Sequence, residues 1–245
     1  DPTNKTVRDA LGADYEFGTL LLATGGAPRR LAIPGGDLPG VLYFRTLEDY
    51  DAARSKAVPG TKCTVIGGGF IGSELAASLN LNGVDVTMVF PGPWLCSRVF
   101  PAGLGQALQR MYEERGIRIV HDSPASISES GPTLLTHTRK GEIIASDFVI
   151  AGVGISPGTE LAQGARLAVD NGVIVDPYLR TSHPDIYAAG DNAKFPYEAL
   201  GLSMRVEHWD NALAQGKLAG RNMTGAQEPY RYMPYFFSDL FDFGY

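Results

Sequence analysis

The chain has 245 residues, of which 44% are hydrophobic and 20% charged, and its formal net charge is −6. This size and composition suffice for one large or two ordinary domains with real cores. The acidic balance gives no general attraction to nucleic acid or anionic lipid, so neither is expected as a partner. The longest apolar runs, 19–24 and 148–154, have strand length and fall short of the roughly 20 residues of a spanning helix. No membrane segment is expected.

The start of the chain and its two cysteines bear on the cellular compartment of the protein. The first residue is Asp1, and no basic region followed by an apolar stretch opens the chain, so no signal peptide is expected and the sequence reads as a fragment or a processed chain. Cys63 and Cys96 form no CxxC motif, and Cys63 opens an apolar strand where a thiol would be inert. A dithiol mechanism is therefore disfavoured. The cysteine usage fits a reducing compartment, either the cytoplasm or a reducing organelle lumen.

The first 60 residues predict a small β-rich region. Residues 5–17 alternate polar and apolar side chains, as at the end of a β-meander, and residues 19–24 form a buried strand that stops at a glycine pair. Thr46 is followed by two acids and predicts an N-capped helix that reaches about Ala57. A domain boundary is expected within residues 35–60.

A strand–turn–helix–strand pattern follows. Residues 63–66 predict a strand, residues 70–82 a helix and residues 84–90 a second strand, which together make a βαβ unit. The rest of the chain predicts further elements of both kinds, in this order: a helix over 102–115, a strand over 117–121, a small antiparallel sheet over 125–145, strands over 147–151, 173–175 and 186–189, and a helix over 206–222.

The glycine-rich turn inside the βαβ unit is the main functional motif. Residues 67–72 read G-G-G-F-I-G and fit G-x-G-x-x-G directly after a strand and at the start of a helix. The first glycine permits the tight turn, the second lets a pyrophosphate approach, and the third lets helix and strand pack closely. The helix start adds free N–H groups for the phosphates. The predicted dinucleotide site comprises Gly67, Gly69, Phe70, Ile71, Gly72 and, at the end of a later strand, Gly154. A merely flexible glycine loop is the alternative.

The residues at the end of the second strand do not decide between NAD and NADP as the coenzyme. An acid that binds the adenosine ribose of NAD is expected about 20 residues beyond the turn. Phe90 stands there instead, followed by Pro91 and Gly92, and Arg98 is the nearest cation that could meet the 2′-phosphate of NADP. Both coenzymes therefore remain candidates.

Three ordered motifs carry a family resemblance: VIGGGFIGSELA at 65–76, IYAAGD at 186–191 and RVEHW at 205–209. The chain resembles the FAD-dependent pyridine nucleotide-disulfide oxidoreductase superfamily, and most of all its apoptosis-inducing factor and ferredoxin and rubredoxin reductase branches. The resemblance implies an α/β fold in which a Rossmann-like NAD(P)-binding domain is inserted into a partial FAD-binding domain, as in flavoproteins with two dinucleotide-binding domains. The predicted division is 1–40 and 157–228 for the FAD-binding domain, 41–156 for the NAD(P)-binding domain and 229–245 for the start of a C-terminal interface domain.

The resemblance also implies roles for individual residues. Glu74, expected in the first turn of the helix, would face the nicotinamide and help to orient hydride transfer, whereas its simplest role there is to favour the helix dipole. The segment Phe236, Phe237, Ser238 and Asp239 resembles one whose aromatic residue packs near the flavin, and core packing is its alternative. The implied flavin-side residues are Thr24, Gly25, Gly190, Asp191, Glu207, His208 and Trp209. The alternatives are a turn aspartate for Asp191, a surface acid for Glu207, a satisfied histidine for His208 and an interface tryptophan for Trp209.

The chain departs from the family pattern at both ends. Family members open with a first GxGxxG that binds the ADP half of FAD, and no such motif precedes Leu20. Only residues from Tyr230 onward could begin the C-terminal domain. A fragment of this kind would keep NAD(P)H binding and hold FAD weakly or not at all.

The leading functional hypothesis is a flavoprotein oxidoreductase that passes hydride from NAD(P)H to FAD. Without a CxxC motif, the expected acceptor is ferredoxin, rubredoxin, a quinone or oxygen, so a small electron-carrier protein is a candidate partner and a homodimer a candidate assembly. The rival is a nucleotide-responsive binding protein with little turnover, like apoptosis-inducing factor. A flavin-free dehydrogenase is the third option. The four histidines show no pairing with a nucleophile or metal ligand, so no metal site is expected.

Overall fold

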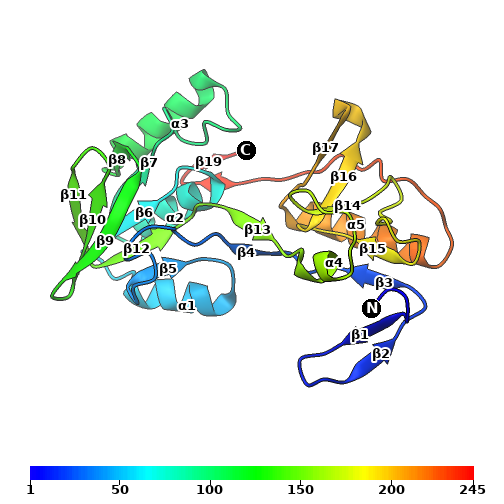
Figure 1. Ribbon diagram of the computed structural model, residues 1–245. Coiled ribbons are helices and arrows are strands. Elements are labelled where there is room, and N and C mark those ends of the chain that lie inside the picture. Colours follow the sequence, from blue (N-terminus) through cyan, green and yellow to red (C-terminus); the bar gives the residue numbers. More distant parts are fainter. The chain divides into compact units, whose positions relative to one another are not determined.

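The computed structural model describes residues 1–245, which divide into two compact units (Figure 1). Unit 1 comprises residues 1–27 and 156–236, and unit 2 comprises residues 28–155 and 237–245. The chain therefore passes between the units three times. Which nucleotide each unit binds remains a prediction.

Unit 2 is built on a parallel sheet of the Rossmann type, with the strand order β5-β12-β6-β7-β8. Its strands are short and mostly buried, as expected for a parallel sheet covered on both faces. In the order of the sheet they are β5 (Val41–Tyr43), β12 (Phe148–Ala151), β6 (Lys62–Ile66), β7 (Asp85–Phe90) and β8 (Arg118–His121).

Helices cover one face of this sheet and an antiparallel sheet covers the other. Cys63 and Val65 pack with the helices, whereas Ile66 packs on the opposite side, because side chains alternate along a strand. The helices are α1 (Leu47–Lys56), α2 (Phe70–Leu81) and α3 (Ala102–Glu114). The antiparallel sheet contains β9 (Pro124–Ser130), β10 (Thr133–Thr138) and β11 (Ile143–Ser146), and its Ile127 and Leu134 complete the second core.

The helix starts show how well local signals work. Thr46 caps α1 as predicted, and its hydroxyl accepts from the Asp49 N–H while the Asp49 side chain accepts from the Thr46 N–H. Helix α5 (Trp209–Met223) begins three residues later than predicted, because Glu207 and His208 stay outside it and His208 is the N-cap. The three-residue strand β5 was not predicted, since so short a run gives no periodic signal.

The last residues form a small hairpin on unit 2. Strands β18 (Asp239–Leu240) and β19 (Phe243–Gly244) pair antiparallel, and the fully buried Leu240 belongs to the core beneath the helices. The Ser238 and Tyr245 backbones exchange two hydrogen bonds of 2.9 and 3.1 Å, which close the hairpin.

Unit 1 contains short strands around one long helix. Strands β3 (Leu20–Leu22) and β15 (Ile186–Ala188) pair in parallel over a core shared with α5. The remaining elements that lie within this unit are β1 (Thr6–Arg8), β2 (Asp14–Glu16), α4 (Glu160–Gly164), β14 (Val173–Ile174), β16 (Ala193–Tyr197), the 3₁₀ turn η1 (Glu198–Leu200) and β17 (Leu202–Met204). Strands β4 (Gly26–Pro28) and β13 (Ile155–Pro157) lie where the chain changes units.

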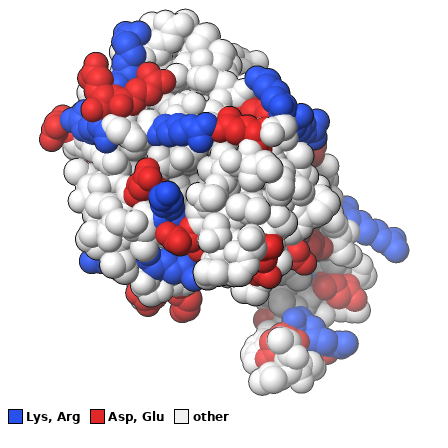
Figure 2. All heavy atoms as spheres, turned by 90° about the vertical axis from the view of Figure 1, so that its left-hand side faces the viewer, with Lys and Arg blue, Asp and Glu red and all other residues white.

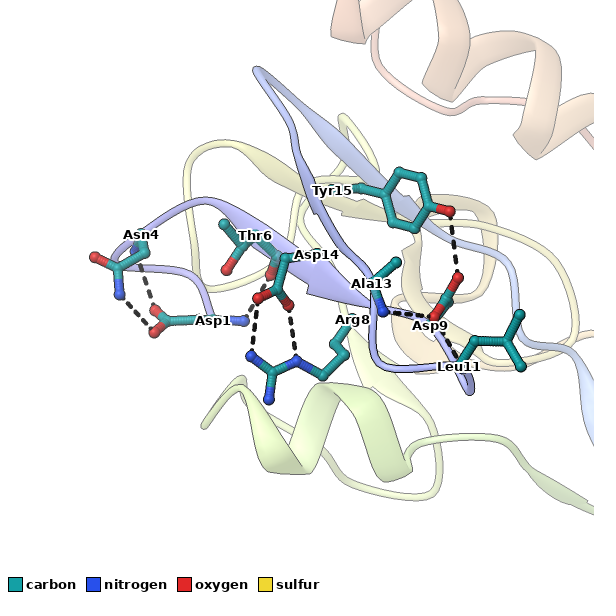
Figure 3. Close-up of polar contacts among 9 residues, drawn as sticks. All are labelled: Asp1, Asn4, Thr6, Arg8, Asp9, Leu11, Ala13, Asp14 and Tyr15. Carbon is teal, nitrogen blue, oxygen red and sulfur yellow. Dashed lines mark hydrogen bonds and ion pairs between the residues drawn. The ribbon is translucent and has the colours of Figure 1, made fainter.

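The β1–β2 hairpin at the start of unit 1 is exposed and is held by polar contacts (Figure 3). Arg8 binds both carboxylate oxygens of Asp14, each at 2.8 Å, and the Asp9 carboxylate accepts from the Leu11 and Ala13 N–H groups and from Tyr15. Such exposed contacts contribute little to stability individually. This hairpin is the predicted end of a meander and carries none of the candidate site residues.

The surface carries both signs of charge. Figure 2 shows lysine and arginine side chains interspersed with acidic ones, without a large area of one sign. Among the helices of the chain, none combines the length and the apolar character that crossing a lipid bilayer requires.

Candidate dinucleotide sites

The glycine turn in unit 2 is shaped by close backbone contacts. Gly67 follows β6 with φ +125°, and a methyl group there would lie 2.3 Å from the Gly152 carbonyl oxygen. A methyl group on Gly72 would lie 2.1 Å from the Gly67 carbonyl oxygen. Neither position can hold a side chain without backbone movement, so these two glycines let α2 approach the sheet closely.

The middle of the turn is open on the side that a phosphate would use. A methyl group on Gly69 would meet nothing within 4 Å, and Gly69 caps α2 without any side-chain hydrogen bond. The N-terminus of a helix leaves backbone N–H groups without intrahelical partners, and these attract anions. The turn therefore fits the pyrophosphate of a dinucleotide.

A second glycine segment lies at the same edge of the sheet. The Gly152 N–H donates to the Ile66 carbonyl at 2.8 Å, which places the end of β12 beside the end of β6. Gly154 has φ +93°, and a methyl group there would meet nothing within 4 Å. The structure thus brings the predicted coenzyme residues of the turn and Gly154 to one edge.

At the end of β7, Phe90 stands where an acid that binds the NAD ribose was expected. Phe90 is buried, and a methyl group on Gly68 would lie 2.5 Å from its ring. The Phe90 ring also meets His121 edge-on, with centroids 5.3 Å apart, and His121 Nδ1 lies 2.7 Å from the Gly92 carbonyl oxygen. Phe90 is therefore a packing residue beneath the turn. Arg98 is exposed.

Glu74 lies deeper in its helix than the first turn. Because α2 begins at Phe70, Glu74 is its fifth residue, and the first turn contains no acid. The expectation of Glu74 in the first turn was therefore wrong. The helix dipole stabilises the Glu74 carboxylate little, since its effect falls off within one turn. Its Oε1 instead accepts a 2.5 Å hydrogen bond from the Ser238 hydroxyl.

In unit 1 the structure brings the predicted flavin-side turns together. Because β3 and β15 are parallel neighbours, the Thr24–Gly25 and Gly190–Asp191 turns leave the sheet at the same edge. Asn192 joins them: its Nδ2 donates to the Thr24 hydroxyl at 2.8 Å and to the Leu22 carbonyl at 3.2 Å.

A buried arginine ties the third motif to the second. The Arg205 side chain is 7% exposed and donates to the Asp191 carbonyl at 2.6 Å and to Glu207 Oε1 at 2.7 Å. It also donates to the Asn171 carbonyl at 2.7 Å. Glu207 is thereby held beside the Gly190–Asp191 turn, although it lies outside α5.

The start of α5 holds the other two predicted residues. His208 is the N-cap, and its Nδ1 accepts from the Asp210 N–H at 3.3 Å. The His208 ring lies 5.8 Å from Trp209 and 6.0 Å from Phe236, measured between centroids. Trp209 is 59% exposed, which fits either a ligand contact or an interface side chain.

Two buried polar atoms beside the Gly190 turn test whether unit 1 fits a flavin nucleotide. Gln215 is fully buried, and its Oε1 accepts from the Gly190 N–H at 2.8 Å, while its Nε2 has no partner. Asn192 Oδ1 is likewise buried without a partner. Buried polar groups are nearly always hydrogen-bonded. The unused hydrogen-bonding capacity of Gln215 and Asn192, together with the exposed Thr24, fits a polar ligand at this edge.

Sequence reasoning missed Arg205, Asn192 and Gln215 as part of these sites, and it named Ser238 only as a member of the aromatic segment 236–239, without its contact with Glu74. Arg205 and Asn192 could have been found, because one opens the R-V-E-H-W motif and the other follows G-D directly. The contacts of Gln215 with Gly190 and of Ser238 with Glu74 leave no local signal, since the partners lie 25 and 164 residues away.

Neither cysteine thiol is placed for chemistry at the two candidate sites. Cys63 and Cys96 are both buried and unpaired, and burial raises the pKa of each thiol. Burial of Cys96 was not predicted; its N–H donates to the Gly68 carbonyl at 2.7 Å and so supports the glycine turn. No group of three or more His, Cys, Asp and Glu side chains in residues 1–245 is arranged to hold a metal ion.

These features define an α/β protein with a Rossmann-like dinucleotide-binding fold, as predicted. The family model of the pyridine nucleotide-disulphide oxidoreductases matches residues 1–216. The chain belongs to this family, and the resemblance seen in its three motifs is confirmed.

Known relatives extend the match over nearly the whole chain. Monodehydroascorbate reductase 3 of Arabidopsis thaliana is 36% identical over 98% of this chain and 58% of its own length. The ferredoxin–NAD(+) reductase component of the anthranilate 1,2-dioxygenase system of Burkholderia cepacia is 36% identical over 94% of this chain and 57% of its own length. A solved ferredoxin reductase from Rhodopseudomonas palustris superposes with a TM-score of 0.95 at 35% identity, over 99% of this chain and 60% of that chain. The chain thus spans about three fifths of the length of its relatives.

Proposed function

We propose that this chain forms the nicotinamide site and part of the flavin site of an oxidoreductase that passes hydride from NAD(P)H to FAD and electrons onward to an acceptor that is not a disulfide. The observation that carries the proposal is that each unit has a sheet edge whose turns are suited to binding a nucleotide. One is the glycine edge of unit 2, and the other is the Thr24 and Gly190–Asp191 edge of unit 1.

We assign the coenzyme residues separate roles, which the geometry of the glycine turn supports. Gly67 and Gly72 bring α2 to the sheet, and Gly69 leaves room for the pyrophosphate. The helix start supplies the N–H groups that bind it. Glu74, one turn further along the helix, would orient the nicotinamide ring, as the family resemblance implies. In this way the binding free energy of the adenosine half holds the reacting ring in place.

The unit 1 edge would hold the flavin nucleotide. Thr24, Gly25 and the Gly190–Asp191 turn are the residues that would bind it, and Arg205 and Gln215 hold that turn in place. Bound FAD would accept the hydride and allow the electrons to leave singly or in pairs. His208 and Trp209 would shield this edge from water.

The acceptor follows from the cysteines and the relatives. Both thiols are buried and unpaired, so the chain offers no dithiol to reduce a disulfide. Relatives named for monodehydroascorbate and for ferredoxin support an organic radical or a small electron-carrier protein as the acceptor. Oxygen and quinones remain further candidates, and a homodimer is the proposed assembly. The unpaired thiols support a reducing compartment.

The test is the visible spectrum of the purified full-length holoprotein before and after anaerobic addition of NADH or NADPH. The proposal expects visible flavin absorption that bleaches with at least one coenzyme. Reoxidation by monodehydroascorbate, a ferredoxin or air, but not by oxidised glutathione, would identify the acceptor class. A colourless protein that ignores both coenzymes would overturn the proposal.

The rival function is nucleotide-controlled binding with little turnover. The exposed Trp209 and Leu213, one turn apart on α5, offer an apolar surface for such a role. Steady-state NADH oxidation with a dye acceptor separates the two functions. Bound flavin with negligible turnover would favour the binding protein.

A further inference from the structure

A single hydrogen bond links the end of the described chain to the dinucleotide helix. The Ser238 hydroxyl donates to Glu74 Oε1 at 2.5 Å, across 164 positions of sequence. Ser238 is 4% exposed, so water does not compete strongly for this bond. Hydrogen bonds to charged groups are roughly twice as strong as neutral ones. The contact is therefore a specific restraint on the Glu74 side chain.

The backbone of Ser238 is held in place by two hydrogen bonds with Tyr245 and by the burial of a neighbouring residue. Its N–H donates to the Tyr245 carbonyl at 2.9 Å and its carbonyl accepts from the Tyr245 N–H at 3.1 Å. Two residues further along, Leu240 is fully buried beneath the helices of unit 2. The hydroxyl donor thus sits on a backbone that the hairpin fixes.

The turn of the hairpin packs against the C-terminal part of α3. The Phe241 ring meets Tyr112 edge-on with centroids 5.1 Å apart, and the Arg115 guanidinium lies 4.5 Å from the Phe241 centroid. Arg115 also binds Asp242 at 2.7 Å. These contacts anchor the hairpin without touching Glu74, so its anchoring and its contact with Glu74 can be separated by mutation.

The Glu74 carboxylate has no other hydrogen bond or ion pair with the protein. It lies beyond the first turn of α2, where the helix dipole no longer fixes a carboxylate. Only Oε1 is engaged by a protein donor, which leaves Oε2 available. A glutamate side chain has three rotatable bonds, so without a donor it would sample several rotamers.

We infer that Ser238 is a positioning residue for Glu74: its hydroxyl holds Oε1 so that Oε2 is presented in one orientation to the nicotinamide half of the bound coenzyme. This inference rests on the proposed function, which places the nicotinamide at Glu74. The glycine turn binds the adenosine half independently of Ser238. The hairpin therefore affects only the recognition of the nicotinamide.

The test compares two ligands on the full-length holoprotein, NADH and ADP-ribose, which lacks the nicotinamide. In Ser238→Ala the dissociation constant for NADH should rise about threefold to tenfold, as the loss of one hydrogen bond predicts, while that for ADP-ribose should stay unchanged. Ser238→Thr keeps a hydroxyl and should restore NADH binding. Thermal unfolding of each variant verifies that it is folded.

A double-mutant cycle with Glu74 tests whether Ser238 acts through this carboxylate. In a Glu74→Ala background, Ser238→Ala should change NADH binding no further, because coupled residues are non-additive. Asp242→Ala is the matched control, since it removes an exposed hairpin contact and leaves the Ser238 hydroxyl in place. It should bind NADH like the unmodified protein.

Each contrary outcome has a distinct meaning. Equal weakening of NADH and ADP-ribose in Ser238→Ala, additive effects in the cycle, or a loss in Asp242→Ala equal to that in Ser238→Ala would overturn the positioning role. An unmodified holoprotein that binds both ligands but transfers no hydride would overturn the proposed function alone. One that binds neither would overturn the dinucleotide site and the inference together.

Discussion

The two candidate nucleotide edges are built by different means. In unit 2, Gly67 and Gly72 form the turn because their missing side chains let backbone meet backbone. In unit 1, the Gly190–Asp191 turn is held by the buried polar side chains of Arg205 and Gln215. The first edge depends on the absence of atoms and the second on hydrogen-bond partners supplied from distant positions.

This difference predicts how each edge fails. Gly67 and Gly72 have no conservative substitute, because any side chain at either position collides with backbone and forces it to move. A polar-built turn loses its partners one at a time and should weaken in steps of one or a few hydrogen bonds. Substitutions in the two edges test this contrast.

The largest effect is expected for Gly72→Ala. Its methyl group would lie 2.1 Å from the Gly67 carbonyl oxygen, so helix and strand must separate, at a cost of about 3 kcal/mol in unfolding free energy. NADH binding should be lost as well. Denaturant unfolding and a fluorescence titration with NADH measure the two effects.

Gly69→Ala in the same turn is the matched control. No atom lies within 4 Å of the added methyl group and φ is −92°, so stability should be unchanged. NADH affinity should still fall about tenfold or more, since the methyl group stands where a pyrophosphate approaches. Unchanged affinity in this variant would argue against a phosphate site at Gly69.

Arg205→Met is expected to be nearly as harmful in unit 1. It removes three donors, two of them to the Asn171 and Asp191 carbonyls and one to Glu207, and should cost about 2–3 kcal/mol. The holoprotein should release flavin at lower denaturant concentration, followed by its visible absorption and fluorescence. NADH binding by the glycine turn should change little.

Arg221→Met is the corresponding control, because Arg221 pairs with Glu228 on an exposed surface. Exposed ion pairs contribute about 0–1 kcal/mol. If Arg221→Met released flavin as readily as Arg205→Met, charge loss in general, and not the link to Asp191, would be responsible.

A smaller step is expected for Gln215→Leu. The substitution keeps the approximate volume but leaves the buried Gly190 N–H without its acceptor, at a cost of about 1–2 kcal/mol. Equilibrium unfolding in urea measures this cost. A neutral outcome would mean that the Gly190 N–H finds another acceptor and that Gln215 does not hold the turn.

The smallest effect concerns the hairpin at high pH. Burial raises the pKa of Tyr245 to about 12, so its neutral form is favoured in the folded protein. This contribution is fully present below the ordinary tyrosine pKa, near 10, and is lost as the pH rises through about 12. Hydrogen exchange of the hairpin amides between pH 9 and 11.5 should show increasing opening.

Tyr245→Phe separates this ionisation from general alkaline unfolding. The variant should lose part of the pH dependence, because its ring has no hydroxyl to ionise. The remaining dependence comes from other groups, including Tyr112, whose pKa is also raised by burial. An identical pH profile in both proteins would show that Tyr245 makes no contribution.

The sequence by itself determined the βαβ unit, the capped helix α1 and the glycine turn. These features arise from interactions among near neighbours: alternating burial, a side chain that caps its own helix, and glycines that permit a turn. The family followed from the same local motifs, and the match over residues 1–216 confirmed it. The roles assigned to individual site residues remain predictions.

Tertiary structure alone decided what holds the candidate sites in place. Local pattern could not show that Phe90 fills the space under Gly68, that Arg205 ties Asp191 to Glu207, or that Ser238 meets Glu74. Each of these contacts joins residues that only the packed fold brings together, and a side chain's neighbours across the fold leave no periodic signal along the chain. The glycine turn was readable because its cause is local, whereas its supports and the polar edge of unit 1 were not.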